Sequence, residues 1–272
     1  YTYLVICTSV FVFLIAPLFV ILPLSFNAEP YIHFSDGVLA LDPEAFSLRW
    51  YEDMIWGTKN PWGLAVRNSF YIAFFATIGA TTLGTIAALG LSSRYMPYKA
   101  LIMSILISPM IIPLIISGSA IFFALAKIGL AASFPGVVMA HIILGTPFVV
   151  ITVTATLSGF DDSITRAASS LGSTPSNTFF KITLPLILPG IISGALFAFV
   201  TSFDEIVVIL FVAGGERSLT TIPLQMWTGL REQLSPTIMA VATCLIVMST
   251  FILVATELLR RRSERIRGIT PQ

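Results

Sequence analysis

The chain alternates long apolar runs with shorter polar connections, and six of the runs are long enough to cross a membrane. An α-helix needs about 20 residues to cross a hydrocarbon layer roughly 30 Å thick. The six runs are Leu4–Phe26, Val66–Leu91, Ala100–Ala126, Phe134–Leu157, Leu186–Val212 and Thr237–Leu259. Because lipid offers no hydrogen-bond partners to the backbone, each run is expected to be helical. We predict an all-α membrane protein with six transmembrane helices in one domain over 1–272.

Two of these runs carry small residues at four-residue spacing. Such stripes allow helix backbones to approach closely in lipid, where the hydrophobic effect does not drive helices together. The second run carries Ala76, Ala80, Gly84 and Ala88, and the fifth carries Gly190, Gly194, Ala198 and Ser202. The stripes predict close packing and give no evidence of chemistry.

Prolines interrupt several runs, including Pro109 and Pro113 in the third and Pro147 in the fourth. A proline removes one backbone hydrogen bond and tends to kink its helix. One interpretation is that these kinks shape a pathway through the membrane. The alternative is that membrane helices simply tolerate proline.

The composition agrees with a membrane protein. Hydrophobic residues make up 56% of the 272 residues and charged residues only 11%, whereas soluble domains have about 25% charged residues. The mean hydropathy is +0.91. These values exclude a soluble globular domain and a disordered chain. The net charge of +1 also argues against a nucleic-acid partner.

The basic residues predict the orientation. Nine Lys and Arg residues fall in the second and fourth connections and the tail, and six fall in the other connections, where most acidic residues also lie. The positive-inside rule therefore places tail 260–272 in the cytoplasm, and six spans place the N-terminus there too. Loops 27–65 and 213–236 are then external. We interpret the Arg-rich tail as an ordinary flank in contact with membrane lipid, rather than a specific lipid-binding patch.

Two adjacent carboxylates, Asp204 and Glu205, interrupt the apolar stretch 195–212. A charge inside a membrane costs at least a few kcal/mol and usually faces a bundle interior or a cavity. On a continuous helix Glu205 would lie on the small-residue face of the fifth run, with Asp204 beside it. We interpret the pair as a cation-attracting patch in a pathway. The alternative is a structural pair bonded by a neighbouring helix, for which His141 is a candidate partner, although a lone His is more often structural.

No catalytic motif occurs in the sequence. It contains neither the Gly-x4-Gly-Lys-[Ser/Thr] phosphate loop nor the His-Glu-x-x-His zinc motif. We therefore expect that this chain binds no cofactor or metal and does not hydrolyse ATP itself.

The connection 158–185 reads SGFDDSITRAASSLGSTPSNTFFKITLP and is too polar to cross a membrane. Asp161–Ser163 can cap a short helix that stops at Gly172. Thr174–Pro175 can begin a second short helix that ends near Pro185. Two exposed short helices with apolar residues on one face predict a docking element for a partner protein.

The spacing within this connection makes the prediction more specific. Ala167–Ala168, three residues, Gly172, nine residues and then Ile182–Pro185 resemble the EAA-x3-G-x9-I-x-LP loop of ABC importer permeases. The resemblance covers almost the whole chain and implies the type I ABC importer permease fold. It also implies a bacterial inner-membrane location and coupling helices that sit in a cleft of a cytoplasmic ATPase. The residues implied in ATPase coupling are Arg166, Ala167, Ala168, Gly172, Ile182, Leu184 and Pro185. Arg166 stands where the family usually has Glu, which alters the charge offered to the ATPase.

Further along, the sequence is similar to the second permease subunit of spermidine/putrescine-type importers. The segments that carry this similarity are 202–205 (SFDE), 214–215 (GG), 224–227 (LQMW), 230–232 (LRE) and 235–238 (SPTI). The similarity implies ATP-driven import of polyamines or related amine-bearing solutes by alternating access. The implied partners are a related permease, an ATPase dimer that binds ATP and Mg²⁺, and an external solute-binding protein. The residues implied in the substrate pathway are Phe203, Asp204, Glu205 and Trp227.

Two other classes of function compete with the permease. One is a membrane scaffold or receptor subunit that docks a cytoplasmic protein but moves no solute. Asp204→Asn combined with Glu205→Gln would abolish uptake only in a permease. The other is an intramembrane enzyme that uses Asp204, Glu205 and His141, but the sequence offers no third catalytic group or water-accessible cleft.

Overall fold

The computed structural model describes residues 2–56, 62–232 and 235–266. Within these ranges the chain is helical apart from its connections and one isolated β-bridge between Asn27 and Phe46. The predicted all-α fold is confirmed. Parts of the predicted external loops (57–61 and 233–234) and the end of the predicted tail (267–272) lie outside the described residues.

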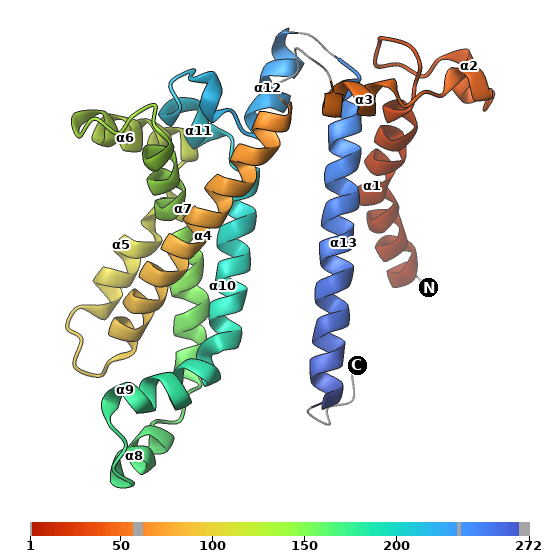
Figure 1. The fold of residues 1–272 in the computed structure, drawn as a ribbon. Helices are drawn as coiled ribbons and strands as arrows, with labels where there is room; N and C mark the ends of the chain where they lie inside the picture. Colours follow the sequence, from red (N-terminus) through yellow and green to blue (C-terminus); the bar gives the residue numbers. More distant parts are fainter. Residues whose placement is uncertain (1, 57–61, 233–234, 267–272) are drawn as a thin grey trace. The chain divides into compact units, whose positions relative to one another are not determined.

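The helices follow one another in the order shown in Figure 1. They are α1 (Thr2–Ser25), α2 (Asp36–Leu39), η1 (Pro43–Ala45), α3 (Arg49–Trp56), α4 (Trp62–Ser92), α5 (Lys99–Ile111), α6 (Leu114–Lys127), α7 (Phe134–Ser158), α8 (Asp162–Ser170), α9 (Pro175–Thr178), η2 (Phe179–Thr183), α10 (Leu184–Asp204), α11 (Val207–Val212), η3 (Arg217–Leu219), α12 (Ile222–Glu232) and α13 (Thr237–Ile266).

Four helices in the described ranges are long and apolar enough to cross a membrane: α1, α4, α7 and the continuous helix Pro175–Asp204. The pair α5 and α6 adds a fifth if it counts as one bent span, and the apolar part of α13, Thr237–Phe251, is shorter. The count of six spans therefore stays a prediction.

The chain divides into two compact units. One comprises Tyr1–Gly63 with Met226–Gln272, and the other comprises Leu64–Gln225. The first is called the terminal unit below, and the second the central unit. The single domain predicted over 1–272 stays a prediction.

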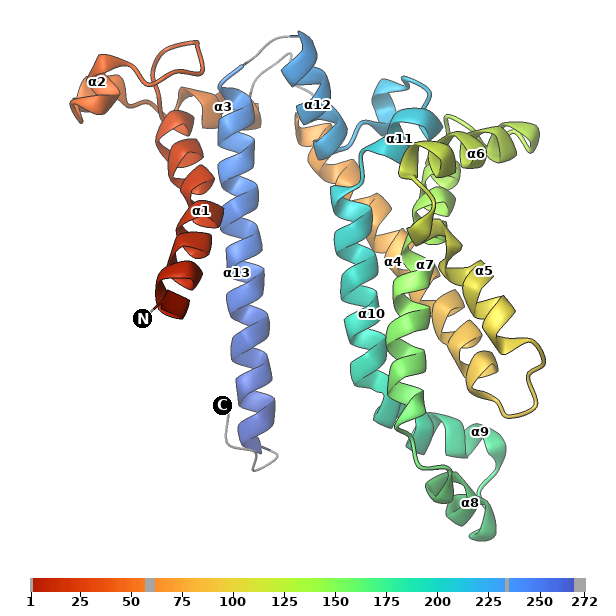
Figure 2. The same ribbon diagram turned by 180° about the vertical axis from the view of Figure 1, so that it is seen from behind.

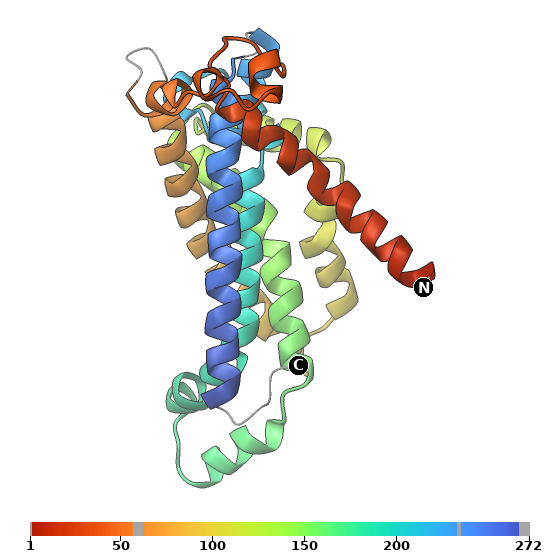
Figure 3. The same cartoon turned by 90° about the vertical axis from the view of Figure 1, so that its right-hand side faces the viewer.

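In the terminal unit, α1 and α3 both pack against α13. Figure 3 shows α1 inclined to α13, with the two helices meeting at the end that carries α3. Two polar contacts join the helices at that end. The hydroxyls of Ser25 in α1 and Tyr51 in α3 lie 2.7 Å apart, and Thr237 Oγ1 of α13 donates to Asp53 Oδ2 of α3 at 3.0 Å.

In the central unit, α4, α7 and α10 pack through their small residues. A Cβ atom placed on Gly145 of α7 would lie 3.2 Å from the Cβ of Ala80 in α4 and 3.1 Å from that of Ala198 in α10. The residues of both predicted stripes are buried, and the apolar cluster beside them includes Val149, Val153 and Ile187. The close packing predicted from the four-residue spacing is therefore confirmed.

Gly194 provides a direct test of this packing. A Cβ atom at this position would clash with Thr152 Oγ1 and lie 2.8 Å from the Cα of Val149, so even alanine forces a shift. We expect Gly194→Ala to lower the free energy of unfolding by about 1–3 kcal/mol, the usual cost of overpacking. Gly90→Ala is the matched control, because a Cβ at that helical position would meet nothing within 4 Å beyond the nearby backbone of its own helix. Thermal unfolding in detergent should separate the two variants, and equal midpoints would contradict the packing.

Two predicted runs contain breaks. The third divides into α5 and α6, which are bent by 105°. The cause is Pro113, which lacks an N–H and forces Ile112 into an extended conformation with ψ of 134°. The fifth run does not continue helically to Val212, because α10 ends at Asp204 and Glu205 is extended with φ of −74° and ψ of 129°. The third run is therefore bent at one of the prolines that predicted a kink, whereas the assumption that the fifth run stays helical through Glu205 was wrong.

The sequence predicted that the second docking helix ends near Pro185, and this prediction was wrong. Instead, α9 continues through the π-helical turn η2 into α10. Pro185 lacks the N–H that would bond the carbonyl of Lys181. The wider turn directly before it accommodates the missing bond.

The central unit has two distinct ends. Figures 1 and 2 show α8 and α9 beyond one end of α7 and α10, whereas α6 and α11 lie at the opposite end. The docking segment predicted from 158–185 and the two carboxylates at 204–205 therefore lie at opposite ends of the same helices.

Candidate functional site

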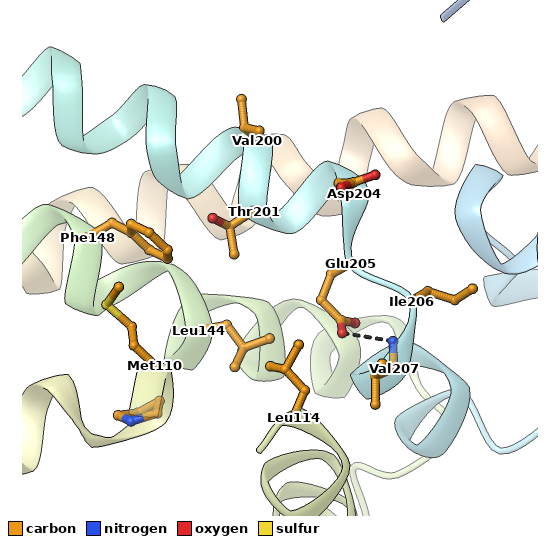
Figure 4. A pocket seen from close by; sticks show the side chains of 11 residues that line it. Met110, Leu114, Leu144, Phe148, Val200, Thr201, Asp204, Glu205, Ile206 and Val207 are labelled. Carbon is orange, nitrogen blue, oxygen red and sulfur yellow. Dashed lines mark hydrogen bonds between the residues drawn. The ribbon is translucent and has the colours of Figure 1, made fainter. Parts of the chain in front are cut away.

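A cavity of about 440 Å³ lies in the central unit where the two helix breaks meet α7. It is open to the surroundings and mainly apolar, with carboxylates at one side (Figure 4). Its lining residues are Pro109, Met110, Leu114, Leu144, Phe148, Val200, Thr201, Asp204, Glu205, Ile206 and Val207. The cavity thus brings Pro109 of the third run together with the carboxylates of the fifth.

Glu205 is buried, with 7% of its surface exposed. Its Oε1 accepts hydrogen bonds from the backbone N–H groups of Val207 at 2.8 Å and Val208 at 2.9 Å. Its Oε2 accepts from Val208 at 2.9 Å and Ile209 at 3.1 Å. The prediction that Glu205 lies on the small-residue face of a helix was therefore wrong, because its carboxylate caps the first turn of α11.

Asp204 is the last residue of α10, and its side chain is exposed. Figure 4 shows its carboxylate pointing in a different direction from that of Glu205. Among the described residues, no hydrogen bond or ion pair engages the Asp204 carboxylate. Asp204 thus lines the cavity with an exposed carboxylate that has no partner among the described residues.

Neither the candidate partner His141 nor the other two predicted pathway residues, Phe203 and Trp227, line this cavity. His141 is buried, and its Nδ1 lies 2.8 Å from Ser202 Oγ, so it bonds α10 rather than the carboxylates. Phe203 packs against Phe70 and Phe199, with ring centroids 5.2 Å and 5.6 Å away. Trp227 is 42% exposed and belongs to the terminal unit.

The helix ends at 161–163 and 172–175 of the docking segment have the local structure that the sequence predicted. The Asp161 carboxylate caps α8, accepting from Ser163 N at 2.8 Å and from Ser163 Oγ at 2.5 Å. These two bonds lower the pKa of Asp161 below its usual value, and the bond from the Ser163 hydroxyl has the larger effect. Asp161 is therefore ionised at neutral pH. Gly172 ends the helix with φ of +82°, and Thr174 Oγ1 accepts from Asn177 N at 3.4 Å.

The predicted coupling residues differ in exposure. Arg166, Ala167, Gly172 and Pro185 are exposed, Ile182 and Leu184 are half-buried, and Ala168 is buried. Leu171 is 89% exposed and was missed by the sequence analysis. The sequence did hold a sign of this exposed residue, because an apolar side chain stands directly before the glycine that ends a polar helix.

A membrane-crossing helical bundle with a charged cavity at one end and an exposed docking segment at the other has the features of a transport subunit that works with a soluble partner. The family comparison agrees. The chain belongs to the family of binding-protein-dependent transport system inner membrane components, whose family model matches residues 80–267. It is a permease subunit of an ABC importer, and in such importers the ATPase is a separate subunit. The predicted family and permease fold are confirmed.

Individual relatives agree with this assignment. The chain is 30% identical over 254 residues to the spermidine/putrescine transport system permease protein PotC of Haemophilus influenzae, covering 93% of this chain and 94% of that protein. It is 32% identical over 244 residues to the putrescine transport system permease protein PotI of Escherichia coli, and the match covers 87% of this chain and 82% of PotI. A bacterial alginate ABC transporter, solved in complex with an alginate pentasaccharide-bound periplasmic protein, shares the fold with a TM-score of 0.69. That alignment has 15% identity and covers 99% of this chain and 96% of the other.

Proposed function

We propose that this permease carries polyamines, such as spermidine and putrescine, or closely related amines. The observation that carries the proposal is the Asp204 carboxylate, which lines the cavity between the two helix breaks and has no hydrogen-bond or ion-pair partner among the described residues. A protonated amine needs a compensating negative charge where water is scarce. The relatives named for spermidine and putrescine transport support the same substrate class.

The fold by itself does not decide the substrate. The alginate transporter has the same fold, although a polysaccharide is chemically unlike a polyamine. The substrate class must therefore follow from the side chains along the path. The cavity presents two carboxylates and no cationic side chain among its lining residues, which favours a cation over an anion.

The proposed complex contains this chain, a second related permease, an ATPase dimer and an external solute-binding protein. The structural neighbour in complex with a periplasmic protein supports the last of these. We place segment 158–185 against the ATPase, which would bind ATP and Mg²⁺. With the six predicted spans, a cytoplasmic connection between the fourth and fifth places both chain termini in the cytoplasm. The exposed Arg166, Ala167 and Leu171 are the side chains of α8 and its end that the ATPase would contact.

Transport then follows from alternating access. ATP closes the ATPase dimer, which moves α8 and α9, and the continuous helix Pro175–Asp204 carries this movement to the cavity. The end of the path at Asp204 opens to the binding protein, and the substrate leaves on the other side after hydrolysis. Such coupling requires that the partners bind the two states with different affinities.

Co-purification in mild detergent, followed by mass spectrometry and an ATPase assay, tests this proposal. We expect an ATPase and a second permease to remain bound, and spermidine-loaded binding protein to stimulate ATP hydrolysis. A neutral sugar with the same binding protein serves as the control. A chain that purifies alone would contradict the proposed complex, and one that purifies with a soluble partner lacking ATPase activity would instead support the scaffold alternative.

A further inference from the structure

Asp204 and Glu205 are neighbours in the sequence, but their carboxylates have different surroundings. Glu205 is buried and bonded to three backbone amides, whereas Asp204 is exposed at the end of α10. We propose that Glu205 is a positioning residue for transport, which fixes the break between α10 and α11 and so holds Asp204 at the cavity. This inference rests on the proposed function, because it assigns the substrate amine to Asp204.

The hydrogen bonds of Glu205 leave little capacity for a ligand. An ionised carboxylate has about four lone-pair sites, and each oxygen of Glu205 already accepts two bonds. A substrate ammonium group could bind there only by displacing backbone amides. Those amides would then be buried without partners, because Val208 and Ile209 have no exposed surface.

The break needs such a cap. The first turn of any helix has N–H groups without intrahelical partners, and the break places the first turn of α11 among buried apolar residues. The cluster around it includes Leu144, Val208, Ile209 and Val212. Glu205 satisfies three of these N–H groups with one side chain, which joins the end of α10 to α11.

The other side of the break is also fixed. Ser202 Oγ bonds the buried His141 of α7 at 2.8 Å, one turn before the break. On the far side, α11 packs against α6 and α7. Asp204 lies between these two attachments, so loosening the Glu205 cap should displace Asp204 without removing its charge.

A double-mutant cycle separates a positioning residue from a second ligand. Asp204→Asn, Glu205→Gln and the double variant would be compared in the assembled complex for spermidine uptake and for hydrogen exchange of the amides of residues 207–209. Glutamine keeps the size of Glu205 but turns one acceptor into a donor that faces N–H groups. Glu216→Gln is the matched control, because Glu216 also caps a backbone amide, Ser218 N at 3.2 Å, at an exposed site.

We expect Glu205→Gln to reduce uptake about tenfold and to speed exchange of these amides by a similar factor, since the cap is local. In the Asp204→Asn background, the same change should reduce uptake by less than about twofold, because residues that act through one another are non-additive. Asp204→Asn alone and Glu216→Gln should leave exchange at 207–209 unchanged.

Two results would overturn the inference. If Glu205→Gln leaves amide exchange unchanged and the two losses of uptake multiply, Glu205 is an independent ligand. If exchange is faster but the losses still multiply, Glu205 stabilises the fold without acting through Asp204. Glu205→Asp provides a milder variant should Glu205→Gln fail to assemble, and the same comparison applies. If the wild-type complex imports no polyamine, the proposed function fails, while the exchange data still report on the cap.

Discussion

Asp204→Asn is expected to reduce ATP-driven spermidine uptake roughly 10- to 100-fold. A hydrogen bond to a charged group contributes about 1.5–3 kcal/mol, and asparagine removes the charge at nearly constant size. The Asp204 carboxylate has no partner among the described residues, so its removal breaks no bond seen in the described structure. Initial rates of labelled spermidine uptake into proteoliposomes, at saturating binding protein, provide the measurement.

Assembly should survive this change, because Asp204 is exposed. Glu44→Gln removes an exposed acid from the predicted external loop 27–65 and serves as the control, which should transport at the wild-type rate. If Asp204→Asn transports as fast as Glu44→Gln, Asp204 does not contact the substrate.

Gly172→Val is expected to lower both uptake and binding-protein-stimulated ATP hydrolysis at least about tenfold. Gly172 has φ of +82°, which is strained for any side chain and particularly so for a β-branched one. Strain of this kind costs roughly 1–3 kcal/mol, enough to shift α8 and the exposed Leu171 away from their docking geometry. The cost comes from the backbone conformation alone, since a Cβ at this position would meet no atom within 4 Å beyond its chain neighbours.

Gly159→Val controls for the substitution itself. Gly159 lies in the same segment with φ of −94°, and a Cβ there would lie 3.9 Å from Thr156 O, which is ordinary contact. It should retain coupling, and both variants should insert into the membrane in normal amounts. If Gly172→Val kept wild-type uptake and wild-type stimulated ATP hydrolysis, the docking role proposed for segment 158–185 would be contradicted.

Much of the architecture could be predicted because its causes are local. Four-residue spacing of small side chains indicated correctly that α4 and α10 pack closely, although it did not identify α7 as the helix they pack against. The capping residues Asp161 and Thr174, together with Gly172, predicted where α8 ends and α9 begins. These signals depend on backbone geometry and on side chains within a few residues of each other.

The two helix breaks show the limit of hydropathy as evidence. A window of apolar residues records that a segment can enter a membrane, but it does not record where the backbone changes direction. Pro113 was visible in the sequence as a kink, but the size of the bend depends on how α6 packs against α11. The break at Glu205 depends on a side chain that bonds amides two to four residues ahead.

The candidate site was predicted in part for the same reason. The two carboxylates were identified by their unusual place in an apolar run, which is a reliable signal of function or of buried bonding. Helical geometry then placed Glu205 on the wrong face, because it assumed that α10 continued. Asp204 lines the cavity and stays the proposed pathway residue, and Leu171 adds an exposed apolar side chain at the docking end.

ATP-dependent uptake by the reconstituted complex tests the central claim most directly. Proteoliposomes that hold this chain with its co-purifying partners, loaded inside with ATP and Mg²⁺, would be supplied with binding protein and labelled spermidine. We predict accumulation that requires ATP, competes with putrescine and is lost in Asp204→Asn. Stimulated ATP hydrolysis without any spermidine or putrescine accumulation would contradict the assignment of this permease to polyamine transport.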